Sequence, residues 1–146
     1  MKVIAYTRPD GGVSIVVPAR EGVKALAKSE SRAVPVGAER VVIDSSEIPS
    51  DRTFRNAFRL NSGKVEVDMP EARKIHLSRL RELRDQKLRE KDVEWSRALA
   101  KGETADAQAV EDDRQALRDL PPKAMAAMRA IETPDDLKIY IPVELS

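Results

Sequence analysis

Cysteine is absent from this 146-residue chain, which excludes disulfide bonds, thiolate metal sites and cysteine catalysis. Aromatic residues make up only 3% of the sequence, so the core must rest on valine, isoleucine, leucine and alanine. No apolar run approaches the length that crosses a bilayer. The N-terminal MKVIAYTRPDGG also has too short an apolar run for a signal peptide. We therefore expect no membrane association, and a protein made and used in a cytoplasm or packed into an assembly built there.

Catalytic and ligand-binding motifs are also scarce. His76 is the only histidine, so no second imidazole can complete a metal site or a proton relay. We interpret His76 as a partly exposed packing residue. The acids at 111–113 are neighbours on a helix that point in different directions, and the segment 10–12 lacks the spacing and the lysine of a phosphate loop. The sequence therefore predicts a protein that is not an enzyme and that carries no catalytic residue, metal or cofactor.

The charge of the chain is balanced overall but uneven along its length. Residues 1–101 carry 21 basic and 15 acidic side chains, whereas residues 102–146 carry 5 basic and 10 acidic ones. Two outside partners of opposite charge would explain this split. We favour the interpretation that the two parts fold against each other.

The first part of the chain, residues 1–68, is predicted to form a β-rich α+β lobe. The turn residues RPDGG lie between two β-branched runs, which predicts a β-hairpin. A second hairpin is predicted around Asn61-Ser62-Gly63, where alternating charged and apolar residues indicate one wet and one dry face. The expected elements are strands at 2–7 and 13–18, a short helix at 22–29, a strand at 41–44, and strands at 57–60 and 64–68.

The second part, residues 69–120, is predicted to form an antiparallel helical hairpin. Asp68-Met69-Pro70-Glu71 has the features of a helix start: an acid at the N-cap, proline in the first turn and a carboxylate at the third helical position. No glycine or proline follows until Gly102, which allows about 50 Å of helix at 1.5 Å per residue. Thr104 can then cap a second helix.

Two consecutive prolines, Pro121 and Pro122, are expected to end this second helix at Leu120, because proline lacks the amide donor and clashes with the preceding turn. Residues 121–146 then form short helices and a tail. We expect one helix at 123–131 and the start of another at Thr133-Pro134-Asp135-Asp136.

An apolar stripe along the two helices supplies the candidate contact residues. Leucines recur every eleven residues on the first helix, a period that keeps a stripe nearly straight. These residues are predicted to hold the hairpin together and to contact a partner. They are Leu77, Leu80, Leu88, Trp95, Leu99, Leu117 and Leu120.

The register of the hairpin follows from a reversal near Gly102. Leu117 and Leu120 are expected to lie near Leu80 and Leu83, and Trp95 should be substantially buried against the second helix. The acids at 111–113 should then lie opposite basic residues of the first helix. The expected ion pairs place these acids opposite Lys87, Arg89 and Lys91, Arg118 near Asp85, and Asp119 near a basic side chain of the first helix.

The basic residues of the first helix could suggest nucleic-acid binding. Residues 71–97 hold nine basic side chains, but six acidic ones are interleaved with them at helical i,i+3 and i,i+4 spacings. These acids cancel the field that a polyanion would feel, and no aromatic residues are interleaved for base stacking. We therefore expect no nucleic acid among the partners.

The segments RLRELRDQKLREKDVEW at 79–95 and RQALRDLPP at 114–122 together resemble the C-terminal module of bacteriophage tail-fibre assembly chaperones and related small tail proteins. Such modules show an arginine-rich R-x-x-R-D-x-x-L helix with an acid and a tryptophan, followed by a Y/RQALRDLP helix end. The resemblance covers roughly residues 48–140, and the RQALRDLP octet is its most specific piece. The matching residues are Arg81, Arg84, Asp85, Leu88, Asp92 and Trp95, and then residues 114–121.

This resemblance implies a non-catalytic role in phage tail assembly. The partner would be a tail-fibre or baseplate polypeptide, bound transiently in the cytoplasm of the bacterial host so that it folds and oligomerises. The alternative is a structural tail or baseplate subunit that stays in the virion and bundles with copies of itself or with another tail protein.

Overall fold

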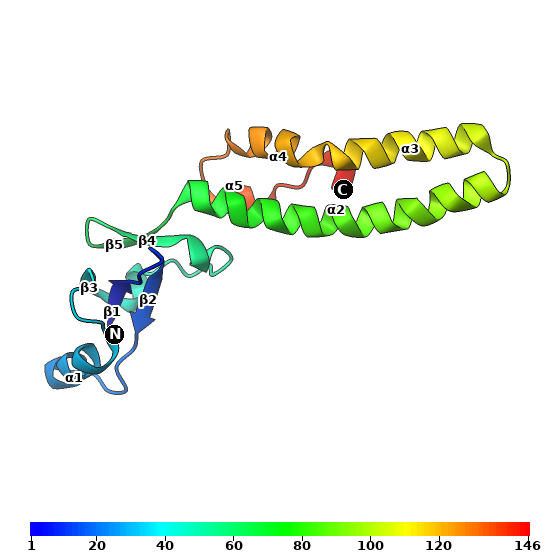
Figure 1. Cartoon of the computed structure of the whole chain (residues 1–146). Coiled ribbons are helices and arrows are strands. Elements are labelled where there is room, and N and C mark those ends of the chain that lie inside the picture. Colours follow the sequence, from blue (N-terminus) through cyan, green and yellow to red (C-terminus); the bar gives the residue numbers. More distant parts are fainter. The chain divides into compact units, whose positions relative to one another are not determined.

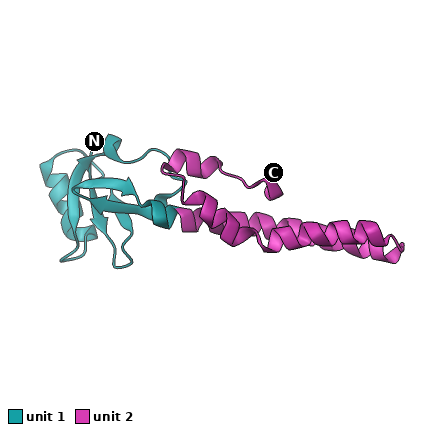
Figure 2. Ribbon diagram, turned by 90° about the horizontal axis from the view of Figure 1, so that it is seen from above, with its two compact units in different colours: residues 1–72 teal, residues 73–146 magenta.

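The structure is a computed structural model that describes residues 1–146 (Figure 1). The chain divides into two compact units, Met1–Ala72 and Arg73–Ser146, which we call unit 1 and unit 2 (Figure 2). Antiparallel strands and helices are both present, so the α+β class predicted from the sequence is confirmed. None of the helices combines the length and the apolar character that a membrane span requires.

Unit 1 contains two antiparallel sheets. The three-stranded sheet has the order β2-β1-β3, and the second sheet pairs β4 with β5. Because β1 is central, Val3, Ile4 and Ala5 are all buried even though they alternate between the two faces. The elements are β1 (Lys2–Thr7), β2 (Val13–Val16), α1 (Val23–Ala33), β3 (Arg40–Asp44), the 3-10 helices Ser45–Glu47 and Arg55–Ala57, β4 (Phe58–Asn61) and β5 (Lys64–Val67).

Both predicted hairpins are present. In the turn between β1 and β2, Gly11 has a φ of 84°, and the Gly12 amide donates to the Asp10 carboxylate at 2.8 Å. Between β4 and β5, Ser62 and Gly63 have φ values of 51° and 77°, the two positive angles of a type I′ turn. The short helix predicted at 22–29 is longer than expected, because it continues to Ala33.

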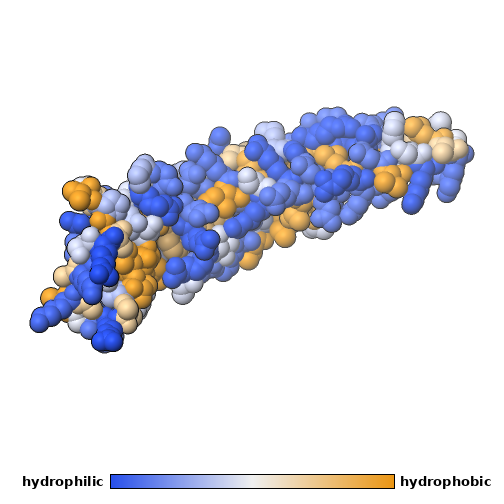
Figure 3. Space-filling model, turned by 60° about the horizontal axis from the view of Figure 1, so that its bottom comes forward, coloured by the Kyte–Doolittle hydropathy of each residue, from blue (hydrophilic) through white to orange (hydrophobic).

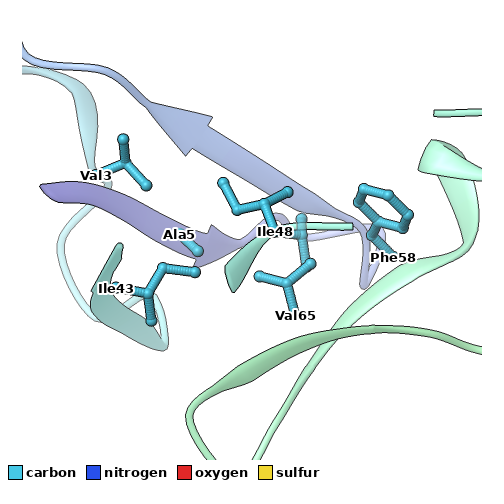
Figure 4. Packing of buried hydrophobic residues seen from close by; sticks show 7 residues of the cluster. Val3, Ala5, Ile43, Ile48, Phe58 and Val65 are labelled. Atoms are coloured by element: carbon cyan, nitrogen blue, oxygen red, sulfur yellow. The ribbon is translucent and has the colours of Figure 1, made fainter. Parts of the chain in front are cut away.

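The core of unit 1 joins the two sheets (Figure 4). Val3 and Ala5 come from β1 and Ile43 from β3, whereas Phe58 and Val65 come from the β4-β5 hairpin. Neither sheet is large enough to bury an apolar face by itself, since two or three short strands are marginal in water. Packing them on one another gives each sheet a dry side.

Asp44 caps the 3-10 helix that follows β3. Its carboxylate accepts hydrogen bonds from the amide and the hydroxyl of Ser46, at 3.1 and 2.8 Å, and from the amino group of Met1 at 3.2 Å. These bonds, the Ser46 amide first, lower the pKa of Asp44 from 3.8 to about 2. The charged form is favoured in the folded state, so Asp44 contributes stability above pH 3.8 that is lost as the pH falls through about 2.

We therefore expect an NMR titration of the Asp44 carboxyl to give a midpoint near 2. Asp44→Asn keeps an oxygen that can accept from Ser46 but does not titrate. Unit 1 of this variant should lose less stability than the wild type as the pH falls from 3.8 to about 2. A midpoint at the ordinary value of 3.8 would contradict the hydrogen-bonded geometry.

Unit 2 consists of helices, with α2 and α3 running antiparallel (Figure 1). The start of α2 at Met69 and its end at Ala100 agree with the sequence prediction, and Gly102 makes the turn with a φ of 72°. The first four residues of α2 belong to unit 1, so the unit boundary lies past Asp68, where the sequence pattern changes. The helices are α2 (Met69–Ala100), α3 (Thr104–Arg118), α4 (Leu120–Met128), α5 (Pro134–Ile139) and the 3-10 helix Val143–Leu145.

The prolines after α3 have a different role from the predicted one. Helix α3 ends at Arg118, and α4 begins at Leu120 with Pro121 and Pro122 in its first turn. Proline is tolerated there because the first amides of a helix have no intrahelical acceptor. The helix predicted at 123–131 therefore starts three residues earlier. The helix start predicted at 133–136 is present, and Thr133 Oγ1 accepts from the Asp136 amide.

Candidate functional site

The seam between α2 and the returning chain buries four of the seven predicted contact residues. Leu77 and Leu80 come from α2, Leu117 from α3 and Leu120 from α4. Leu77, Leu80 and Leu120 line one narrow crevice together with Ala124, so the predicted approach of Leu120 to Leu80 is confirmed. These side chains are needed to hold unit 2 together and are therefore not free to contact a partner.

Two leucines on or near the predicted stripe lie outside the buried seam. Leu83, expected near Leu117 and Leu120, is 45% exposed, and Leu99, predicted to contact the hairpin or a partner, is 47% exposed. Eleven residues exceed three helical turns slightly, so each repeat rotates the stripe by about 20°. Leu99, two repeats after Leu77, has left the seam, and the smaller Ala98 takes the buried position beside it.

Leu88, Trp95 and Leu99 form a partly exposed line on α2 that we call the Trp95 stripe. Their spacings of seven and four residues place them on one side of the helix. Leu88 and Trp95 are half-buried and Leu99 is exposed. Trp95 was expected to be substantially buried but is only half-buried, and a charged side chain of α3 lies over its ring. The guanidinium carbon of Arg114 lies 4.7 Å from the centroid of the indole ring.

Arg114 links the Trp95 stripe to a group of charged residues. Its Nε atom lies 2.8 Å from the Asp92 carboxylate, and its Nη1 atom forms an ion pair with the Glu111 carboxylate. Glu111 also accepts from Arg118 at 2.9 Å. The hydrogen bond from Arg118, together with the charge of Arg114, lowers the pKa of the Glu111 carboxyl. Arg114 is therefore held over the indole ring by carboxylates from both helices.

The predicted ion pairs across the hairpin are only partly present. Lys91 lies 3.4 Å from the Asp113 carboxylate, as the register predicted. Arg118 bonds to Glu111 and not to Asp85, since a residue seven positions away on the same helix lies on the same face. Asp119 does not contact a basic residue of α2. It accepts a hydrogen bond from Gln115, its neighbour at i−4.

The segment that follows α4, residues 129–146, forms a third layer over the N-terminal part of α2 (Figure 1). Arg73 donates to the carbonyl oxygens of Met128 and Ile131, at 3.0 and 2.8 Å. His76 Nε2 lies 2.8 Å from the Tyr140 carbonyl oxygen, so this nitrogen is the one that donates. His76 is 5% exposed, and the prediction of a partly exposed residue is wrong because the C-terminal segment covers it.

The third layer reaches no further along α2 than Lys87. Lys87 Nζ donates to the carbonyl oxygens of Glu144 and Ser146, both at 3.3 Å. The carboxylate of Glu144 is paired with Lys123 of α4, which lowers the pKa of Glu144 and raises that of Lys123. The prediction had placed Lys87 opposite the acids of α3. Its actual partners lie more than fifty residues away, and no local pattern indicates them.

Beyond Lys87, the side-chain hydrogen bonds and ion pairs of α2 are made within the helix or to α3. The hairpin there is two helices thick, and two helices cannot surround each other's apolar side chains. The Trp95 stripe lies in this part and has no third helix against it. On the face drawn in Figure 3, hydrophobic residues lie in separate patches among hydrophilic ones.

The region around the Trp95 stripe is suited to binding another polypeptide. It contains no recognised set of metal ligands. The structure brings together no group of three histidine or acidic side chains that could hold a metal ion. No protein-family model matches the chain, and no curated protein or solved structure is similar enough to match it. The candidate functional site is therefore the Trp95 stripe with Arg114 beside it.

Proposed function

We propose that this protein is an accessory protein of phage tail assembly that binds a tail-fibre or baseplate polypeptide through the Trp95 stripe. The observation that carries the proposal is the exposure of Leu99 beside half-buried Trp95 and Leu88, in the two-helix part of the hairpin. The role is non-catalytic. Binding takes place in the cytoplasm of the bacterial host while tails are being assembled.

The composition of the stripe suits a contact that forms and is then released. Tryptophan and arginine are the residues that most often dominate binding energy at protein interfaces. Here, Arg114 already lies over the Trp95 ring, so both side chains are positioned before a partner arrives. From Leu88 to Leu99 the stripe is about 16 Å long at 1.5 Å per residue, which matches two to three turns of a partner helix.

The phage context rests on the resemblance found in the sequence. The two matched segments meet in unit 2, because Arg114 of the RQALRDLP octet pairs with Asp92 and stacks over Trp95 of the first segment. Leu117 and Leu120 of the octet are buried. The leucines of the octet pack the hairpin, and its arginine is positioned over the tryptophan of the first segment. Both matched segments therefore contribute to the same region of unit 2, which supports the proposed assignment.

A second candidate function is that of a structural subunit retained in the virion. Leu83 and Val93 are exposed apolar residues of α2 that lie away from the Trp95 stripe. A long helix with exposed apolar residues outside its intramolecular seam can bundle with other helices. The subunit would then associate with its own copies or with another tail protein, and it would be found in the finished tail.

The proposal is tested by co-expressing the chain with the tail-fibre polypeptide of the genome that encodes it. We expect the two to co-purify and the soluble yield of the fibre polypeptide to rise. Leu99→Ala should weaken this complex while leaving the isolated protein as stable as the wild type, because Leu99 is exposed. Loss of an exposed contact of this size should cost about tenfold or less in affinity.

The matched control is Val93→Ala, which truncates an exposed apolar residue outside the stripe. Binding that is weakened equally by both variants would remove the stripe as the docking site. Mass spectrometry of purified particles separates the two candidate functions, because an assembly chaperone is absent from the finished virion and a subunit is present. Absence of any complex with fibre or baseplate polypeptides would contradict the first candidate function.

A further inference from the structure

A shallow hollow in unit 1 is lined by positive charge. It has a volume of about 540 Å³ and lies along α1 and the residues that precede it. Four of its seven lining residues are basic, and none is acidic or aromatic. The basic residues, which we call the α1 basic row, are Arg20, Lys24, Lys28 and Arg32, and all four are exposed.

The spacing of the row is regular. Lys24, Lys28 and Arg32 follow each other at four-residue intervals on one side of α1, and Arg20 continues the spacing before the helix begins. Four residues advance a helix by about 6 Å. The helical part of the row therefore presents a cation about every 6 Å over roughly 12 Å.

None of the four cations is neutralised within the protein. No carboxylate forms an ion pair with any of them, in contrast to Arg40 of β3, which binds Glu30 of α1 at 3.0 Å. The other neighbouring acid, Glu21, does not line the hollow. The acidic residues close to the row are therefore either engaged elsewhere or outside it.

The row is unfavourable for the helix that carries it. Like charges at i,i+4 repel one another, and α1 has two such pairs. The helix also lacks a side-chain N-cap bond and has no fully buried residue, so little else supports it. An anionic ligand in the hollow would reduce the repulsion between the basic side chains. Binding such a ligand would explain why α1 carries a row of like charges.

We propose that the α1 basic row binds an acidic segment of a polypeptide in extended conformation. Side chains on one face of an extended chain recur about every 6.6 Å, close to the 6 Å spacing of the row. Alternating glutamate or aspartate residues would therefore place successive carboxylates opposite successive cations. This site is independent of the Trp95 stripe and lies in the other unit.

Nucleic acid fits the hollow less well. Its lining contains no aromatic residue on which a base could stack. Unit 1 as a whole carries 11 basic and 10 acidic side chains, so it lacks the strong net charge that attracts a phosphate backbone. The hollow gathers four cations on a unit that has almost no net charge. It is therefore better suited to a short acidic peptide than to a long polyanion.

The test uses the full-length protein and a labelled peptide of alternating glutamate and threonine, about ten residues long so that it exceeds the row. Fluorescence anisotropy at low salt should detect binding that weakens as salt is added. A peptide with glutamine in place of glutamate should not bind. The double variant Lys24→Gln/Lys28→Gln should weaken binding about tenfold, because two exposed ion pairs are lost.

Two control variants separate loss of charge from loss of structure. Lys24→Arg/Lys28→Arg keeps the charges and should keep the affinity, and Lys64→Gln removes an exposed lysine of β5 outside the hollow and should also bind normally. The proposal is overturned if the acidic peptide does not bind or if the glutamine double variant binds it as tightly as the wild type. Tighter binding of an oligothymidylate of equal length would also overturn it, in favour of nucleic-acid phosphates.

Discussion

Leu117→Ala should lower the free energy of unfolding of unit 2 by about 2–5 kcal/mol, the range for truncating a buried leucine. Leu117 is 3% exposed in the seam of the hairpin, so its removal leaves a cavity that the long helices cannot close. Chemical denaturation followed by Trp95 fluorescence measures the effect, because the only tryptophan of the chain lies in unit 2.

Two variants serve as controls for this prediction. Leu99→Ala makes the same chemical change at an exposed position and should alter stability by less than about 0.5 kcal/mol. Arg118→Ala removes a partly exposed ion pair with Glu111 and should cost only about 0–1 kcal/mol. If Leu117→Ala and Leu99→Ala melted alike, the seam would not be the core of unit 2, and its leucines would belong to an interface between molecules.

Phe58→Ala should destabilise unit 1 by about 3–5 kcal/mol, the largest effect that we expect in that unit. Phe58 is 3% exposed and begins β4, which packs in the core shared by the two sheets. Since neither sheet is stable alone, loss of the aromatic ring should loosen both. Hydrogen exchange of the β1 amides measures the change without interference from unit 2.

Val65→Ala and Val36→Ala provide a matched pair for the same core. Val65 is buried in the cluster around Phe58, whereas Val36 is fully exposed. Only the first should accelerate exchange in β1. Unchanged exchange in both Phe58→Ala and Val65→Ala would mean that the β4-β5 hairpin does not support the three-stranded sheet.

The prediction of the elements succeeded wherever the signal was local. The turn at Asn61-Ser62-Gly63, the helix start at Met69 and the reversal at Gly102 all depend on backbone preferences of the residues themselves. The prolines after Leu120 were misread, because proline is compatible both with the end of one helix and with the first turn of the next.

The candidate site was predicted in part. Periodicity correctly selected Leu77, Leu80, Leu117 and Leu120 as buried residues, because the amphipathic pattern of a helix reports which side faces its neighbour. Periodicity did not show that Leu99 is exposed, because a rotation of about 20° per repeat accumulates until the residue leaves the seam. A sequence period predicts only approximately the direction in which a helical side chain points. Near the edge of a narrow seam, this is not enough to predict whether the side chain is buried.

Local backbone preferences and apolar periodicity were sufficient to predict the α+β class, the hairpins of unit 1 and the two long helices with their turn. Which apolar residues stay exposed and which charged groups meet depends instead on how the helices and the C-terminal segment pack. Arg114 lies over Trp95, and the C-terminal segment covers His76 but not the Trp95 stripe. These contacts join residues 19 and 64 positions apart, respectively, and depend on side-chain geometry that no local pattern encodes.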